Sequence, residues 1–222
     1  SQLPEWLASL NYPRPAESRV DSRLGYATRW YRLPAVSKRP WKYLIIQSAP
    51  PRQPRGGAAL LMEDDRFVVT LDGAAGHYPP TDERGVLEFA RSLAAPDLYQ
   101  AITARGAAPL SPINGYRLTQ NRLRHYDRMQ RSPAGLVALG DSVCALNPLY
   151  GQGMTVAALG ALALRDLLHE SDLACPKLAR GFQRRLARLC KAPWMMATGE
   201  DFRYPGTEGE RPGVGGNLMH WY

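Results

Sequence analysis

A carboxylate and two glycines lie close together in the stretch GDSVCALNPLYGQGM, residues 140–154. Asp141 follows the apolar run GLVALG, and its carboxylate can accept strong hydrogen bonds from hydroxyl groups. Gly151 and Gly153 precede a long apolar segment. The first turn of a helix presents unpaired N–H groups and a partial positive charge, and glycines let a ligand approach that backbone closely. The stretch therefore predicts a ligand site that combines a carboxylate with the start of a helix.

Nucleophilic hydrolysis is one chemistry that these residues could perform. The letters GDSV resemble the serine block of GDSL-type esterases, and Asp166 and His169 form a D-x-x-H pair. In that family the D-x-x-H block lies far downstream, whereas here it follows within one predicted helix. Cys144 also stands where a G-x-S-x-G nucleophile elbow needs its second glycine, and Asn147–Pro148 prevents a helix from starting directly after the serine. The spacing therefore argues against a hydrolase.

A dinucleotide-binding turn is a second possibility for the same glycines. GQGMTV supplies G-x-G, but Val156 replaces the third glycine, and the loop SVCALNPLY separates the motif from the preceding apolar run. GVGGNL near the end of the chain fits no better. A flavin fits the whole stretch, because its ribitol hydroxyls suit Asp141 and its ring carbonyl, which gains negative charge on reduction, suits the helix start.

The segment GLVALGDSVCALNPLYGQGMTVAALGALALRDLL resembles the C-terminal flavin fingerprint of FAD-dependent aromatic hydroxylases of the p-hydroxybenzoate hydroxylase type. That group extends to squalene epoxidases, polyprenyl reductases and flavin halogenases. The resemblance implies that the matching residues bind FAD. Cys144 departs from the pattern, near where many aromatic hydroxylases carry a histidine. The matching residues are Gly140, Asp141, Pro148, Gly151, Gln152, Gly153 and Met154.

The resemblance implies a Rossmann-like α/β flavoprotein hydroxylase fold with an α+β substrate sheet, and the activity of an FAD-dependent monooxygenase. In that reaction NAD(P)H reduces FAD, and one oxygen atom of O2 enters an aromatic or lipophilic organic substrate. The cofactor carries the chemistry, so no side chain is assigned a catalytic role. A prenyl-chain reductase or a halogenase of the same fold is an alternative. A basic, non-enzymatic module that binds membrane or nucleic acid is an alternative from another class.

Two parts of the family pattern are not found in this sequence. The family opens with a strand, G-x-G-x-x-G and a helix that bind the ADP half of FAD, and it carries a second aspartate–glycine motif. SQLPEWLASL is similar to the segment that follows this second motif, so we expect the C-terminal part of a longer flavoprotein. The expected organisation is a connection over 1–13, a substrate-binding antiparallel sheet with helices over 14–132, a returning FAD-binding segment over 133–193 and a tail over 194–222.

The residue patterns predict the following elements. A helix with Pro4 in its first turn is expected over 3–10, and strand-like runs over 19–33, 41–49, 58–64 and 66–73 suggest an antiparallel meander. A helix with Thr81 as its N-cap is expected over 81–93, and a second helix over 95–105. GLVALG has the composition of a strand covered on both faces. The 152–170 helix is apolar nearly all round and should be buried, whereas the 176–191 helix is amphipathic.

Charge and cysteine content narrow the range of partners. The 222-residue chain has a net charge of +8, which favours anionic partners. Five basic residues share one face of the 176–191 helix and suggest peripheral membrane contact, whereas we do not expect nucleic-acid binding. The three sparse cysteines, together with the absence of zinc-ligand spacings and of a visible signal peptide, predict free thiols, no metal site and a cytoplasmic location. The basic residues are Lys177, Arg180, Arg184, Arg188 and Lys191.

Overall fold

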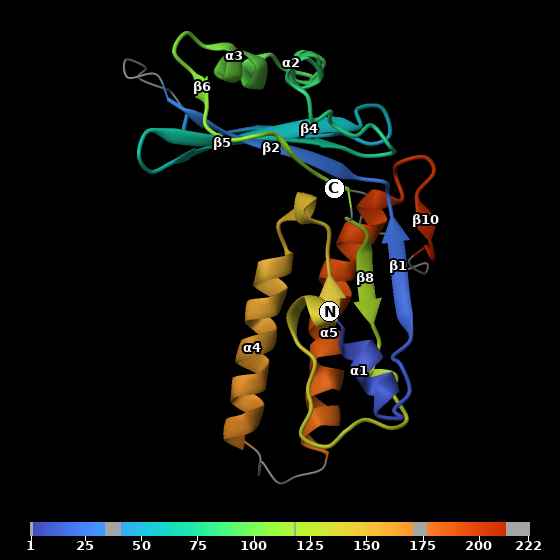
Figure 1. The fold of residues 1–222 in the computed structure, drawn as a ribbon. Helices are drawn as coiled ribbons and strands as arrows, with labels where there is room; N and C mark the ends of the chain where they lie inside the picture. Colours follow the sequence, from blue (N-terminus) through green and yellow to red (C-terminus); the bar gives the residue numbers. More distant parts are fainter. Residues whose placement is uncertain (1, 34–40, 118, 171–176, 212–222) are drawn as a thin grey trace. The chain divides into compact units, whose positions relative to one another are not determined.

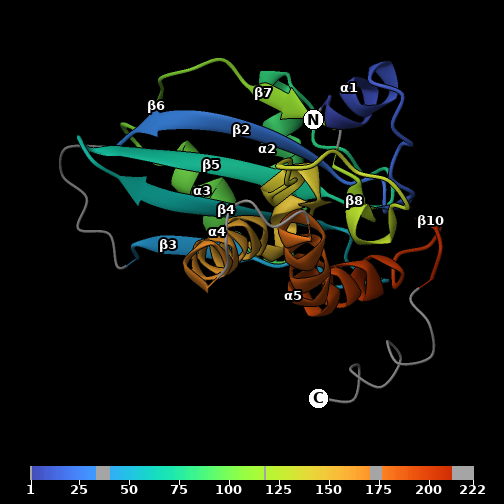
Figure 2. The ribbon, with the colours of Figure 1, turned by 90° about the horizontal axis from the view of Figure 1, so that it is seen from below.

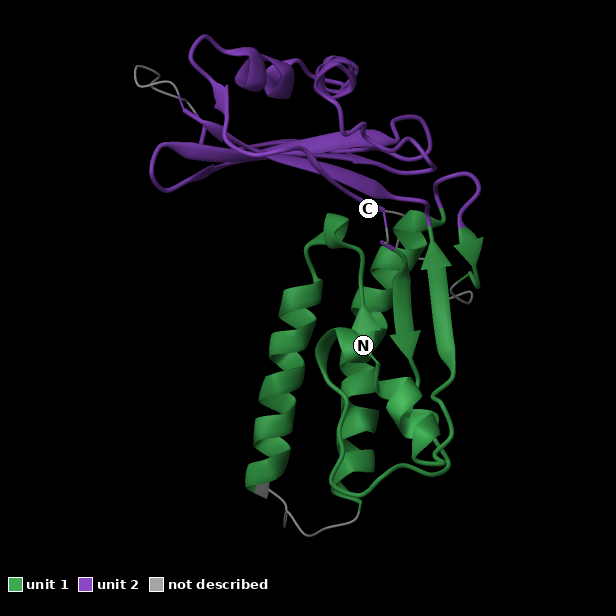
Figure 3. Ribbon diagram, in the orientation of Figure 1, with its two compact units in different colours: residues 1–21, 120–202, 208–222 green, residues 22–119, 203–207 purple. Residues whose placement is uncertain are grey.

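The computed structural model describes residues 2–33, 41–117, 119–170 and 177–211, and it divides into two units (Figure 1 and Figure 3). Unit 1 comprises residues 1–21, 120–202 and 208–222, and unit 2 comprises residues 22–119 and 203–207. Unit 2 is therefore inserted into the chain of unit 1. The expected sheet segment 14–132 extends beyond unit 2 at both ends, because strands β1 (Glu17–Asp21) and β8 (Asn121–Arg124) pair with each other inside unit 1.

Unit 2 is built on an antiparallel sheet with the strand order β3-β4-β5-β2-β6, seen side by side in Figure 2. A further strand, β7, also pairs with β2. The predicted antiparallel meander is confirmed for β3, β4 and β5, whereas β2 pairs with β5 and not with β3. The run over 19–33 is two strands, because the strand is interrupted at 22–24, where Arg23 has a φ of 50°. The strands are β2 (Gly25–Arg32), β3 (Tyr43–Ile46), β4 (Arg55–Met62), β5 (Arg66–Gly73), β6 (Ala108–Pro109) and β7 (Asn114–Tyr116).

Two helices, α2 (Glu83–Arg91) and α3 (Asp97–Thr103), cover one face of this sheet (Figure 1). Alternate residues of β5 point toward them, and Phe67, Val69 and Leu71 are buried in one core with Phe89 and Leu98. The N-cap of α2 is Asp82 and not Thr81, because the Asp82 carboxylate accepts the Gly85 N–H at 2.8 Å. A carboxylate at this position also interacts favourably with the helix dipole.

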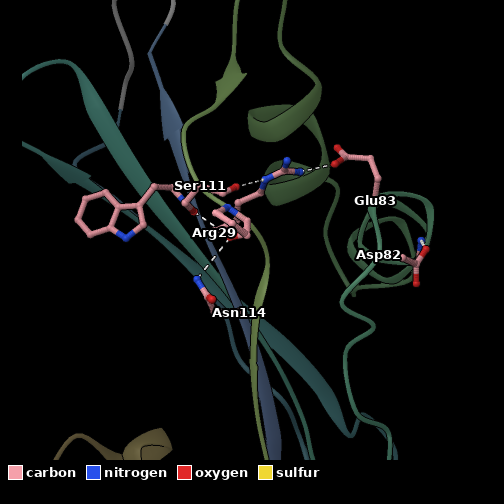
Figure 4. Close-up of polar contacts among 8 residues, drawn as sticks. Arg29, Asp82, Glu83, Ser111 and Asn114 are labelled. Atoms are coloured by element: carbon pink, nitrogen blue, oxygen red, sulfur yellow. Dashed lines mark hydrogen bonds and ion pairs between the residues drawn. The ribbon is translucent and has the colours of Figure 1, made fainter.

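Arg29 fixes the segment that returns past the edge of β2 (Figure 4). Its Nε donates to the Ser111 carbonyl at 3.0 Å, and its guanidinium pairs with Glu83 of α2. The Trp30 N–H donates to the Ser111 hydroxyl at 3.1 Å, and Asn114 Nδ2 lies 3.4 Å from the Pro112 carbonyl. These contacts hold residues 111–114 beside β2, where β7 then pairs. Arg29 therefore has a structural role in unit 2.

Among the described residues, unit 1 contains a small antiparallel sheet in the order β10-β1-β8-β9, together with three α-helices. Strand β9 spans Cys144–Ala145 and β10 spans Glu208–Gly209. The predicted N-terminal helix is α1 (Leu3–Ser9), with Pro4 in its first turn as expected. The two longer helices, α4 (Gly153–Glu170) and α5 (Leu178–Asp201), pack against each other. Their buried side chains include Val156, Ala163, Phe182, Leu186 and Cys190.

The apolar run GLVALG, residues 135–140, is not a strand in this structure. Leu139 has extended dihedral angles (φ −144°, ψ 157°), but no strand in the described part of the chain pairs with the run. Gly135 and Leu136 are exposed, and only Ala138 is buried. An extended segment becomes a strand only when a neighbour supplies hydrogen bonds, so composition alone gave the wrong prediction here.

Helix α4 is not buried all round, contrary to its composition. Val156, Gly160 and Ala163 face inward, whereas Leu159 and Leu162 are 47% and 46% exposed. A side chain at position 160 would meet Leu139 and Leu186 at 2.8 and 3.0 Å, so glycine permits this close approach. The prediction failed because only one side of α4 is covered by the described residues.

Helix α5 is longer than expected and continues ten residues past Lys191. Pro193 lies inside it, where proline normally weakens a helix. The turns beyond Pro193 are nevertheless held by burial of Ala197, Thr198 and Asp201. Tertiary packing thus outweighs the local preference. None of the described helices has the length and low charge content that a bilayer span requires.

Candidate functional site

The stretch 140–154 forms two short 3-10 helices and then enters α4. The first is η2 (Gly140–Ser142) and the second is η3 (Pro148–Tyr150), with β9 between them. Gly140 and Gly151 have φ angles of 61° and 64°, in the left-handed region that glycine adopts without strain. The two glycines therefore allow the chain to turn at the start of η2 and again between η3 and α4.

This loop and the first turns of α4 line a cavity of about 300 Å³ within unit 1. That volume is at the lower end of the range for small-molecule sites. Of the seven residues predicted to bind a cofactor, five line the cavity, whereas Gly140 and Gln152 are not part of its lining. The lining residues are Asp141, Leu146, Pro148, Gly151, Gly153, Met154 and Ala157.

The cavity combines an acceptor with a set of donors. Asp141 is exposed, and its carboxylate makes no hydrogen bond within the described part of the chain, so it does not cap the following turn. The first helical hydrogen bond of α4 runs from the Val156 N–H to the Gln152 carbonyl at 3.0 Å. The N–H groups of residues 153–155 thus lack partners inside the helix and carry its positive dipole end.

The two cavity glycines leave open space above the backbone. A Cβ atom built at Gly151 or Gly153 would meet no heavy atom within 4 Å. At Gly140 it would meet only Ala157 Cβ, at 3.7 Å. Packing among the described residues thus gives no reason for glycine at 153, where it costs up to about 1 kcal/mol relative to alanine in a helix. A flavin, which joins a polyol to a ring with carbonyl acceptors, could use this space together with Asp141 and the helix start.

Sequence reasoning missed the residues beneath the loop. Asn121, Asn147 and Asp201 are buried and hydrogen-bonded to one another, and the Tyr150 hydroxyl joins them. Asn147 gave a local signal, because an asparagine before proline often caps a short turn, and its side chain does accept the Leu149 N–H. Asn121 and Asp201 gave none, because 80 residues separate them in the chain.

The features that suggested a hydrolase do not assemble into a nucleophilic site. Cys144 is buried, and hydrogen bonding with Cys190, followed by burial, raises the pKa of its thiol. A thiol with a raised pKa is a poor nucleophile. Asp166 lies on α4 outside the cavity lining and pairs with Arg165 at 2.8 Å. Cys175 lies outside the described residues.

The predicted basic face lies on α5 and before its first residue. Lys177, Arg180, Arg184, Arg188 and Lys191 are all exposed. Arg184, Arg188 and Lys191 line a second cavity in unit 1, of about 570 Å³, together with apolar residues such as Trp194. This cavity shares no lining residue with the first. The two cavities are therefore lined by different residues, although Val143 of the 140–154 stretch belongs to the lining of the second.

No protein-family model matches the chain. The chain is 33% identical over 199 residues to Protein Rv3254 of Mycobacterium tuberculosis (strain ATCC 25618 / H37Rv). The match covers 88% of this chain but only 41% of that protein. The chain therefore spans less than half the length of this curated relative.

Solved structures with a similar fold include flavin-dependent enzymes. One is a triple mutant of the flavin-dependent brominase Bmp2, with a TM-score of 0.57 and 12% identity, covering 91% of this chain and 52% of the brominase. Another is pqsL of Pseudomonas aeruginosa, a probable FAD-dependent monooxygenase, with a TM-score of 0.53 and 18% identity, covering 82% of this chain and 50% of pqsL. The predicted mixed α/β flavoprotein hydroxylase fold is thus confirmed for a chain that spans about half of such proteins.

Proposed function

We propose that this chain is the substrate-binding and C-terminal flavin-binding part of an FAD-dependent monooxygenase. The observation that carries the proposal is the 300 Å³ cavity, in which Asp141, the cavity glycines and the start of α4 meet. The fold shared with flavin-dependent enzymes supports it. The proposed reaction uses NAD(P)H as reductant and inserts one oxygen atom of O2 into an aromatic or lipophilic organic substrate.

Each residue of the loop has a defined task in this proposal. Asp141 accepts hydrogen bonds from the ribitol hydroxyls, because its carboxylate has no competing partner in the described chain. The N–H groups of residues 153–155 stabilise negative charge on the ring through the helix dipole. Leu146, Pro148 and Ala157 give the cavity an apolar wall that excludes water. When bound, FAD supplies the redox chemistry by passing electrons from NAD(P)H to O2.

The experiment that tests the function uses the full-length protein. We expect flavin absorbance after dialysis, NAD(P)H oxidation that depends on an organic substrate, and one labelled oxygen atom in the product when ¹⁸O2 is supplied. A halide requirement with a halogenated product would favour the halogenase alternative. An oxygen-independent reduction of a prenyl chain would favour the reductase alternative. A full-length protein that binds no flavin would contradict all three.

Gly153→Val tests the placement of the flavin against the helix start. The structure leaves room for the side chain, so the variant should fold, but the side chain would occupy the space assigned to the ring. We expect at least about tenfold weaker FAD binding, because the backbone N–H groups lose their close contact. Gly181→Val is the matched control, since Gly181 also lies in a helix with open space above it. Equal flavin affinity in the two variants would contradict the placement.

The basic face supports a second, non-enzymatic role at anionic surfaces. Its residues are exposed, and three of them line the separate 570 Å³ cavity. Binding of the protein to anionic vesicles in a salt-sensitive manner, with no effect of flavin, would favour that role.

A further inference from the structure

A buried carboxylate lies beneath the loop that lines the proposed flavin site. Asp201, the last residue of α5, is 1% exposed, and Asn121 of β8 is 0% exposed. Asn121 Nδ2 donates to Asp201 Oδ2 at 2.6 Å, and the Tyr150 hydroxyl donates to Asp201 Oδ1 at 2.7 Å. Asn147 Nδ2 lies 3.3 Å from both carboxylate oxygens. Three donors, two of them from the loop, therefore converge on one buried acceptor.

The orientation of the two amides is fixed by backbone N–H groups. The Asn147 N–H donates to Asn121 Oδ1 at 2.7 Å, and the Leu149 N–H donates to Asn147 Oδ1 at 3.0 Å. Each amide oxygen is thus used as an acceptor, which leaves each NH2 group directed at position 201. Only an acceptor satisfies both groups there, because a donor would face two other donors in a buried site.

The network acts on the part of the chain that shapes the cavity. Asn147 directly precedes Pro148 in the sequence, and Tyr150 directly precedes Gly151. Pro148 and Gly151 both line the cavity. Asn147 is 1% exposed, so its contacts cannot be replaced by water without local opening. Fixing residues 147 and 150 thus fixes the turn that precedes α4.

We infer that Asp201 is a positioning residue: its carboxylate holds loop 147–151 so that Pro148, Gly151 and the start of α4 face the cavity. The identity of the ligand rests on the proposed function, whereas the effect on the loop does not. Asp201 lies 60 residues beyond Asp141 in the sequence and is not part of the cavity lining. It acts through Asn147 and Tyr150 and is not a catalytic residue.

The test exchanges the carboxylate and the amide between two positions of the full-length protein. Asp201→Asn replaces a carboxylate oxygen with an NH2 group, which would face the NH2 groups of Asn121 and Asn147. Asn121→Asp places two carboxylates together. The double variant N121D/D201N restores the pairing, because the carboxylate introduced at position 121 would accept from the Asn147 N–H and from the new amide at position 201. Readouts are hydrogen exchange of the Asn147, Leu149 and Gly151 amides, the FAD dissociation constant, and the visible circular dichroism of the flavin.

We expect each single variant to accelerate exchange of these amides at least about tenfold and to weaken FAD binding by a similar factor. The double variant should return within about threefold of the parent. Parental exchange in Asp201→Asn, or a double variant no better than either single variant, would overturn the inference. If the parent binds no FAD, the proposed function fails, and the exchange rates still decide the role of Asp201.

A milder pair of variants covers the case in which the single variants fail to fold. Tyr150→Phe removes one donor to Asp201 and keeps the ring. We expect faster exchange at Gly151 and weaker FAD binding, both by several-fold. Tyr12→Phe, in unit 1 but outside the network, should change neither. Equal behaviour of Tyr150→Phe and Tyr12→Phe would also overturn the inference.

Discussion

Helices α4 and α5 lie side by side in unit 1 (Figure 1). The exposure of their apolar side chains nevertheless differs. In α5, Phe182 and Leu186 are buried and the basic residues point to solvent. In α4, leucines occupy the outward side as well, and Leu159 and Leu162 are nearly half exposed. The apolar face of α5 is therefore covered within unit 1, whereas α4 carries more apolar surface than the described residues cover. We expect further polypeptide of a longer protein to cover that surface.

Phe182→Ala in the 222-residue chain should give the largest effect. Phe182 is fully buried against the core of unit 1, so its truncation leaves a cavity. We expect the free energy of unfolding to fall by about 3–5 kcal/mol. Leu162→Ala on α4 should cost less than about 1 kcal/mol in the same chain, because the side chain is already half exposed. Urea denaturation compares the two, and equal losses would remove the contrast between the helices.

Asp72 of β5 should make the stability of unit 2 depend on pH, which distinguishes it from changes in the stability of unit 1. Burial raises the pKa of its carboxyl to about 7, and Oδ2 has no hydrogen-bond partner among the described residues. Since the pKa is 3.8 in the absence of burial, the folded state binds the extra proton between about pH 4 and 7. Stability should thus fall as pH rises through this window, by up to about 4 kcal/mol.

Asp72→Asn should remove this pH dependence and be more stable than the parent at about pH 8. Thermal or urea unfolding between about pH 4 and 8 provides the measurement. Phe182→Ala should leave the pH slope unchanged, since its effect belongs to unit 1. A parental slope that survives in Asp72→Asn would show that other groups cause it.

The same Leu162→Ala substitution in the full-length protein should be more costly than in the 222-residue chain. If further polypeptide covers α4, the loss should rise to about 2–3 kcal/mol, the range for a buried leucine. The shorter chain should also self-associate, and Leu159→Ser with Leu162→Ser should reduce this. Analytical ultracentrifugation and denaturation of both proteins give the measurements. Identical, small losses in the two contexts would mean that α4 remains exposed.

Charge reversal on the basic face of α5 should have the smallest effect on the stability of the protein. Arg184→Glu with Arg188→Glu should weaken binding to anionic vesicles by about 1 kcal/mol per charge and leave the stability unchanged. These residues are exposed and are not part of the lining of the cavity at the 140–154 loop. Arg84→Glu with Arg105→Glu, both exposed in unit 2, changes the net charge equally and is the control. Equal weakening by the two pairs would mean that net charge, and not this face, drives binding.

The sequence predicted features that depend on neighbouring residues. Alternating apolar residues and turns predicted β2, β3, β4 and β5 of unit 2, but not the short strands β6 and β7. Five of the seven residues suggested for cofactor binding line the candidate cavity. The same local signals could not choose between Thr81 and Asp82, since both can cap a helix.

Features that depend on distant partners were not predictable. The composition of GLVALG and of α4 indicates what those segments need around them, but not whether this chain supplies it. Asn121 and Asp201 are ordinary polar residues until the fold brings them together. The sequence therefore indicated the loop that lines the cavity but not the buried hydrogen bonds beneath that loop.

The insertion of unit 2 into unit 1 has a consequence for folding order. Strands β1 and β8 pair across roughly 100 intervening residues, as in the register Val20↔Asn121. Closing a flexible loop of that length costs about 4 kcal/mol in chain entropy. The Thr119 hydroxyl, however, donates to the Leu24 carbonyl at 2.6 Å and joins the two ends of the insert within unit 2 itself. Unit 2 should therefore fold first and bring its two ends close together. Strands β1 and β8 can then pair without closing a long flexible loop, which should speed the folding of unit 1.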